Sequence, residues 1–292
     1  MVTTSGLCAN CGAPASSVCA GCRYGLDVNG DLVASTLYCG QPCQKEHRNI
    51  HKGSCKANLD RMQLYRAGVF LQKVFDYYRE HSWAQPIREI RVDENGSIHV
   101  YYADATSGSV YARFPTEIFA TEEDKRAVLV HEADAFATRN LHATVINLLK
   151  GQQTLEDVSR VTHRSAKVLA DLKSPVSHVV VRPQAATRVI TYDPDGERER
   201  TETQRHIFRV DLRDGNAYAF DLCSAQCGTG SGLASRTVTP WPAYEQGLAS
   251  GLIHGTFEHY TSISGARRCY FSTSGRNVWC HLPHRHTFDP RV

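Results

Sequence analysis

Four pairs of cysteine and histidine side chains lie within the first 55 residues, and they constrain the fold more than any other feature. In chain order, the pairs are Cys8 and Cys11, Cys19 and Cys22, Cys39 and Cys43, and His51 and Cys55. A two-residue gap lets both thiolates point at one ion, and a three-residue gap puts both side chains on one face of a helical turn. Because a structural zinc site needs four ligands, these pairs predict two zinc ions. With little aliphatic content in this segment, the ions must stabilise it, by on the order of 10 kcal/mol each.

The distribution of cysteines indicates the redox compartment of the protein. Seven of its 11 cysteines lie before residue 56 and the other four lie after residue 222. Clustered thiols are typical of metal ligands in a reducing compartment. The N-terminal residues show no signal-peptide pattern, and no apolar stretch approaches the roughly 20 residues of a membrane span. We therefore expect an intracellular protein, in the cytoplasm or nucleus, that does not enter a membrane.

The segments Tyr38-Cys39-x3-Cys43-Gln44 and His51-Lys52-x2-Cys55 resemble the signature of the MYND zinc finger. This resemblance covers about a fifth of the chain. It implies that the ligand pairs interleave. One ion would be held by Cys8, Cys11, Cys39 and Cys43, and the other by Cys19, Cys22, His51 and Cys55. His47 is the alternative imidazole to His51.

The resemblance also implies a partner. In the MYND family a tryptophan and a neighbouring glutamine help to form a groove for proline-containing peptides. Gln44 is present here, but Arg48 stands where the family usually carries the tryptophan. The resemblance therefore implies a protein or peptide partner, but the tryptophan that usually contacts this partner is replaced by Arg48. Asn29-Gly30 predicts a small hairpin in the long stretch between the second and third ligand pairs.

The rest of the chain predicts an α+β domain, so that we expect a finger over residues 1–56 and a domain over 57–292. Apolar residues at helical spacing between Lys56 and His81 predict one long amphipathic helix, buried through Leu59, Met62, Val69, Phe70, Val74, Tyr77 and Tyr78. Further helices are expected at Glu122–Phe136, capped by Thr121, and at 141–149 and 154–172. Strands of a largely antiparallel sheet are expected at 87–92, 98–102, 110–114, 178–181, 189–192, 207–212 and 217–222.

One hairpin carries a candidate catalytic site. If Asp214-Gly215 is a two-residue turn, then His206 faces Cys223, and Asp221 lies on the same side of the sheet. A histidine and an aspartate on adjacent strands resemble the His–Asp half of transglutaminase-like and papain-like folds. That resemblance implies acyl transfer with His206 as base, Asp221 orienting it and Cys223 as the nucleophile, although those families place the cysteine upstream.

Two other interpretations of this region stay open. The histidine and aspartate are also compatible with ordinary hydrogen bonding inside a sheet. A third metal site would use Cys223 and Cys227 with Cys269, Cys280 or His281, but no pair there has a two-residue gap. The histidines at 281, 284 and 286 and the glycine-rich segment 228–232 are weaker signals.

The sequence thus leaves two function classes open and does not decide whether the protein is an enzyme. In the first class, a zinc finger attached to an α+β domain recruits a protein partner. In the second, the domain is an acyl- or aminoacyl-transferase that uses the His206, Asp221 and Cys223 site, with tRNA as one candidate partner. In outline, such a chain is similar to fungal arginine-containing cyclodipeptide synthases. The net charge of +3 permits contact with nucleic acid without arguing for it.

Overall fold

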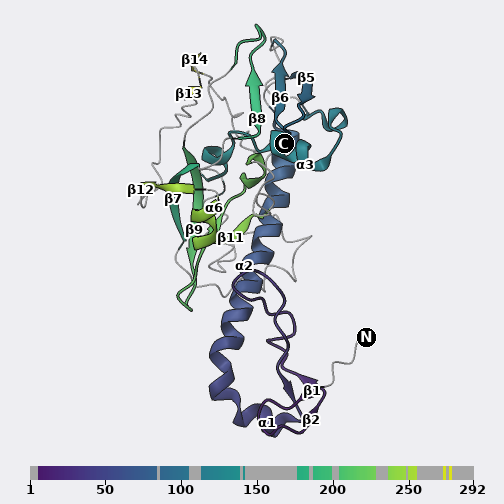
Figure 1. Ribbon diagram of the computed structural model, residues 1–292, viewed down its shortest axis with the longest axis vertical. Coiled ribbons are helices and arrows are strands. Elements are labelled where there is room, and N and C mark those ends of the chain that lie inside the picture. Colours follow the sequence, from purple (N-terminus) through teal and green to yellow (C-terminus); the bar gives the residue numbers. More distant parts are fainter. Residues whose placement is uncertain are drawn as a thin grey trace, which may run out of the picture. The chain divides into compact units, whose positions relative to one another are not determined.

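The computed structural model describes residues 6–83, 86–104, 113–138, 141, 176–183, 187–198, 204–227, 236–247, 249–254, 272–273 and 276–277. Its elements form a cysteine-rich module, then a long helix, then a mixture of helices and two main sheets (Figure 1). This order confirms the α+β class. Most of the helix expected at 141–149, all of the helix expected at 154–172 and most of the strand expected at 110–114 lie outside the described residues.

The cysteine-rich module is built from short pieces. Two small antiparallel pairs join β1 (Gly6–Leu7) to β2 (Pro14–Ala15) and β3 (Ser17–Val18) to β4 (Leu37–Tyr38). A short helix, α1 (Gln41–Glu46), follows, with Pro42 in its first turn, where a missing N–H costs nothing. The only apolar cluster of this segment among the described residues is made largely of cysteines around Tyr38. Such a core cannot hold the chain together without further cross-links.

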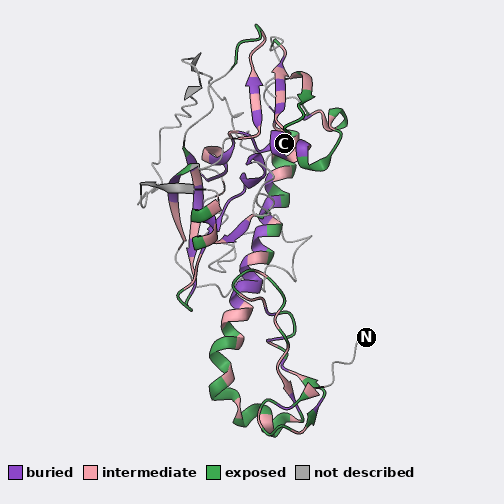
Figure 2. Ribbon diagram, in the orientation of Figure 1, coloured by how far each residue is buried: buried purple, intermediate pink, exposed green. Residues whose placement is uncertain are grey.

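The long helix α2 spans Arg48–His81 without a break. Its burial begins at Asp60, and the preceding turns are exposed or half-buried (Figure 2). The buried side chains include Leu64, Leu71 and Phe75. The expected apolar face is therefore partly wrong, because Val69, Val74, Tyr77 and Tyr78 are exposed. Among the described residues, no helix is both long and apolar enough to cross a membrane.

A five-stranded sheet follows the order β11-β10-β9-β7-β12. Its strands are β7 (Val176–Pro183), β9 (Arg205–Asp211), β10 (Ala217–Phe220), β11 (Val238–Pro240) and β12 (Ala249–His254). One face packs on α2 through residues such as Phe208, Val210 and Phe220. The other face, with Ile207 and Ala219, packs on α6 (Trp241–Gly247). The sheet is thus covered by a helix on each side.

A smaller sheet has the order β5-β6-β8, with β5 (Ile87–Val92), β6 (Ile98–Tyr102) and β8 (Val189–Tyr192). The pair β5–β6 is antiparallel, whereas β6 and β8 run parallel. A separate cluster that includes Ile98, Val128 and Leu129 packs this sheet against α3 (Glu122–Leu129).

Helix α3 begins as expected and ends earlier. Thr121 caps it, because its hydroxyl accepts a hydrogen bond of 3.0 Å from the Asp124 backbone N–H. The expected continuation to Phe136 is wrong. A turn follows Leu129, with Glu132 at φ 50°, before helical structure resumes at 134–138. In the C-terminal unit, Glu258–Val292, only the hairpin of β13 (Ser272–Thr273) and β14 (Arg276–Asn277) is described.

Candidate metal centre

Two tight turns present the first four cysteines of the finger. In the first, the Gly12 N–H donates to the Cys8 carbonyl at 2.9 Å, and Gly12 has a φ of 74°, which favours glycine. In the second, the Cys22 N–H donates to the Cys19 carbonyl at 3.0 Å. A β-carbon on Gly21 would lie 2.7 Å from Cys55 Sγ, so a glycine lets that sulfur approach the turn.

Three of the remaining four ligand candidates lie in helices, and Cys39 lies just before one. Cys39 follows β4, and Cys43 lies one helical turn further on, in α1. His51 and Cys55 are also one turn apart, near the start of α2. Helical geometry places side chains four residues apart on the same face, so His51 and Cys55 converge on one point. Cys39 meets Cys43 from the bend that leads into α1.

The structure brings Cys8, Cys11, Cys39 and Cys43 into one cluster, with their sulfur atoms all within 4.8 Å of one another. Cys11 Sγ lies 3.6 Å from Cys39 Sγ, and Cys39 Sγ lies 3.4 Å from Cys43 Sγ. Tetrahedral zinc with bonds of about 2.3 Å places its sulfur ligands about 3.8 Å apart. A disulfide would bring them to about 2.05 Å. The spacing therefore fits four thiolates around one ion.

The second cluster contains Cys19, Cys22, His51 and Cys55, with ligand atoms again within 4.8 Å. Cys19 Sγ lies 3.8 Å from Cys55 Sγ, and Cys22 Sγ lies 3.1 Å from His51 Nε2. His47 takes a different position. Its Nδ1 lies 3.0 Å from the Tyr38 hydroxyl, and its ring stacks on that of His51 with centroids 6.0 Å apart. His47 is thus a neighbour of the second cluster and not one of its four ligand candidates.

The thiols of these clusters differ widely in pKa. Hydrogen bonding from the Cys11 backbone lowers the pKa of Cys8 to about 6. Hydrogen bonding with the Cys43 side chain raises the pKa of Cys39 to about 12, and burial raises the pKa of Cys55 to about 12. Neighbouring thiols packed this closely cannot all ionise unless a cation balances them. A zinc ion would supply that charge and release the protons.

The donor sets, four sulfurs in one cluster and three sulfurs with one imidazole in the other, are those that zinc prefers in structural sites. Each set has four ligands, so no position stays open for a substrate. The two clusters also alternate along the chain: the first and third ligand pairs form one cluster, and the second and fourth pairs form the other. Each cluster therefore joins two segments that flank a ligand pair of the other cluster. These are the features of a small cross-braced zinc-finger module.

Comparison with known families agrees with this class: residues 8–55 match the MYND finger. The chain therefore carries a MYND zinc finger in its N-terminal segment. No curated protein and no solved structure matches the chain. The resemblance of the remaining residues to transglutaminase-like or papain-like folds, or to a cyclodipeptide synthase, accordingly finds no support.

The expected arrangement of His206, Asp221 and Cys223 on one face of a hairpin is wrong. The register of β9 and β10 pairs Phe208 with Phe220 and Val210 with Tyr218. The turn has three residues instead of two. The Gly215 N–H donates to the Leu212 carbonyl, and Leu212 pairs with Asn216. Glycine at φ 85° completes this common three-residue hairpin loop. One extra residue moves Asp221 to the opposite face from His206.

The three candidate catalytic residues accordingly have separate surroundings. His206 Nδ1 lies 3.0 Å from His178 Nε2. Asp221 forms an ion pair with Arg205 and accepts a hydrogen bond from Tyr244, both at 2.9 Å. Cys223 is buried, and burial raises the pKa of its thiol well above the usual range. A buried, protonated thiol is a poor nucleophile.

A third metal site is not assembled within the described residues, where only the two finger clusters bring together three or more suitable ligands. Cys227 Sγ instead accepts a hydrogen bond of 2.8 Å from Arg205 Nη1. Cys269, Cys280, His281, His284, His286 and segment 228–232 lie outside the described residues.

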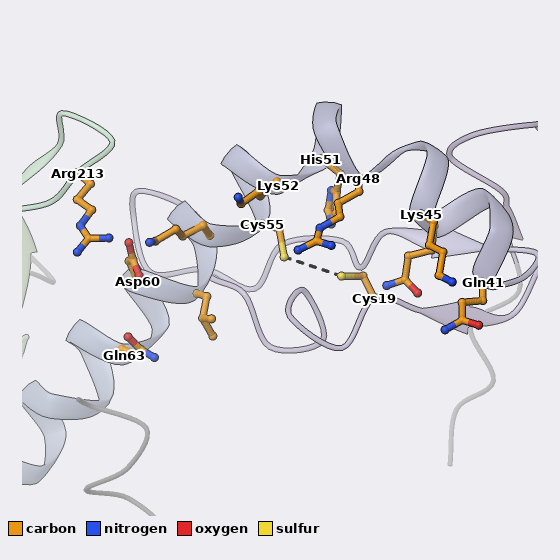
Figure 3. Close-up of a pocket in the computed structure, with 13 residues that line it drawn as sticks. Cys19, Gln41, Lys45, Arg48, His51, Lys52, Cys55, Asp60, Gln63 and Arg213 are labelled. Atoms are coloured by element: carbon orange, nitrogen blue, oxygen red, sulfur yellow. Dashed lines mark hydrogen bonds between the residues drawn. The ribbon is translucent and has the colours of Figure 1, made fainter. Parts of the chain in front are cut away.

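A groove of about 640 Å³ runs beside the second cluster, and sequence patterns alone did not predict it. Figure 3 shows Gln41, Lys45, Arg48 and Lys52 along α1 and α2, with Arg213 towards the opposite end of the groove from Gln41. The lining residues are Cys19, Gln41, Gln44, Lys45, Arg48, His51, Lys52, Cys55, Lys56, Leu59, Asp60, Gln63 and Arg213. The sequence pattern that could have indicated this groove is the set of cations at positions 45, 48, 52 and 56, which have the spacing of one helical face.

Proposed function

We propose that this protein is a protein-binding adaptor whose finger holds two structural zinc ions and recruits a partner protein. In this proposal residues 1–56 form the finger and residues 57–292 the α+β domain, and α2 belongs to both. The ions are held by Cys8, Cys11, Cys39 and Cys43, and by Cys19, Cys22, His51 and Cys55.

The observation that carries the proposal is the pair of closed four-ligand clusters within the segment that matches the MYND finger. MYND fingers are generally protein-interaction modules. Closed zinc sites stabilise a fold and leave no coordination position for catalysis. The clustered, unpaired thiols also suit the reducing interior of a cell.

The test is a selection of peptides from a random library on the full-length protein, with its zinc content measured by native mass spectrometry. We expect two zinc ions per chain and an enriched peptide motif whose recovery disappears after a chelator removes them. Recovery of no zinc-dependent motif, or of a protein that holds no zinc, would overturn the proposal.

A further inference from the structure

The groove beside the second cluster has a strongly one-sided charge. Five of its lining side chains are exposed cations: Lys45, Arg48, Lys52, Lys56 and Arg213. Among the described residues that line it, the only carboxylate is Asp60, which is buried. A zinc ion with three thiolates and one neutral imidazole would add one net negative charge. The cations therefore still outnumber the negative charges around the groove.

These cations are available to a ligand. Within the described part of the chain, none of the five forms an ion pair with a carboxylate. The neighbouring Glu46 does not line the groove, and its Oε2 accepts a hydrogen bond of 2.8 Å from the Asn10 side chain. Arg48, Lys52 and Lys56 follow one another at four-residue spacing on α2, where like charges repel and destabilise a helix. A bound polyanion would relieve that repulsion.

Arg213 reaches the groove from the β9–β10 turn. The next residue, Asp214, forms an ion pair with Arg61 of α2. Arg61 Nη1 also donates to the Asn58 side chain at 2.8 Å, so two contacts fix its position. The three-residue turn that separates His206 from Asp221 therefore also places a cation at one end of the groove.

The remaining lining residues favour a peptide over a nucleic acid. Gln41 and Gln44 offer amide donors and acceptors that can bond to a peptide backbone, and Leu59 offers an apolar contact. The described lining contains no phenylalanine, tyrosine or tryptophan on which a base could stack. Its volume is in the range of pockets for short ligands, about 300–1,000 Å³.

We propose that this groove binds an extended segment of the partner protein that is rich in aspartate and glutamate. Carboxylates of the segment pair with Arg48, Lys52 and their neighbours, and its backbone bonds to the glutamine amides. This inference deepens the proposed function and rests on it, because it names the chemistry of the partner.

The experiment measures binding of a fluorescein-labelled glutamate-rich peptide to the full-length, zinc-loaded protein by fluorescence anisotropy. The double variant Arg48→Glu with Lys52→Glu should weaken binding by about tenfold or more, because two favourable contacts become repulsive. The matched control is Arg66→Glu with Lys73→Glu, the same charge change at exposed positions of α2 outside the groove. The control should bind within about twofold of the wild type once salt screens its distant charges.

Three results would overturn the inference. The first is equal affinity for a peptide in which every glutamate is replaced by glutamine. The second is a single-stranded RNA that binds more tightly than the peptide and depends on the same cations. The third is loss of zinc from the milder Arg48→Gln with Lys52→Gln variant, which would assign these cations to the metal site. A zinc-dependent but non-acidic motif from the peptide selection would overturn this inference alone and leave the proposed function standing.

Discussion

Arg205 and Asp221 form an ion pair, with 2.9 Å between Arg205 Nη2 and Asp221 Oδ2, and both side chains are almost completely buried. Surrounding groups complete the network. Arg205 Nη2 also donates to the Cys223 carbonyl at 2.9 Å, and the Tyr244 hydroxyl donates to Asp221 Oδ2 at the same distance. The pair thus connects β9, the end of β10 and α6. Its role follows from this position: it holds the α6 side of the five-stranded sheet together.

Replacing Asp221 with alanine should destabilise the protein by about 3–5 kcal/mol, because the Arg205 guanidinium would stay buried without its counterion. The measurement is urea unfolding of zinc-saturated protein. Glu89→Ala is the control, since Glu89 pairs with Arg91 in an exposed position and should cost less than about 1 kcal/mol. Equal costs for the two variants would contradict a structural role for the buried pair.

Stability should fall with acidity through His131. Burial, aided by nearby Arg79 and partly opposed by Gln226, lowers the pKa of His131 from 6.5 to about 4. Between these values the unfolded chain binds a proton that the folded chain does not. Folding is therefore favoured by neutral His131 above pH 6.5, and roughly 3 kcal/mol is lost as the pH falls from 6.5 to 4.

The check is the unfolding free energy of the wild type and of His131→Leu across this pH range. The wild type should show the steeper slope. Release of zinc in acid affects both proteins and cancels in the difference, provided that zinc content is followed in each. Parallel slopes would show that His131 titrates normally in the folded protein.

Each zinc ion should depend on its own ligand set, because the two clusters share no residue. His51→Ala should leave one ion per chain by native mass spectrometry, and Cys39→Ser should remove the other one. His47→Ala is the matched control, since His47 contacts Tyr38 and should not alter the count. A chain that keeps two ions without His51 but loses one without His47 would reverse the assignment.

Two glycines of α2 should respond oppositely to alanine. A β-carbon on Gly68 would lie 2.5 Å from Val238 Cγ2, so Gly68→Ala forces α2 away from β11 and should cost about 1–3 kcal/mol. Gly53 has nothing within 4 Å, and Gly53→Ala should add up to about 1 kcal/mol from helix propensity. Thermal unfolding measures both. Similar stabilisation by both changes would contradict the close contact at Gly68.

The turn between β9 and β10 shows how a local pattern can mislead. The segments at 27–31, 93–97 and 193–197 also place glycine at positive φ before the chain returns, with an aspartate carboxylate accepting from backbone N–H groups. All four turns end in Asn-Gly or Asp-Gly, the dipeptides of a two-residue loop. The dipeptide predicts that the chain turns, and it does not decide how many residues the loop contains.

The sequence by itself determined the features that depend on short spacing. Candidate zinc ligands follow from gaps of two and three residues, the cap at Thr121 from its own helix, and β5, β6 and β8 from local alternation. Only the tertiary structure decided which distant residues meet. The β9–β10 register places Asp221 on the same face of the sheet as Arg205, with which it forms an ion pair, and on the opposite face from His206. The close approach of Val238 to α2 leaves room only for glycine at position 68. The physical reason is that ligand gaps and periodicity are properties of neighbours along the chain, whereas register and packing depend on surfaces far apart in sequence.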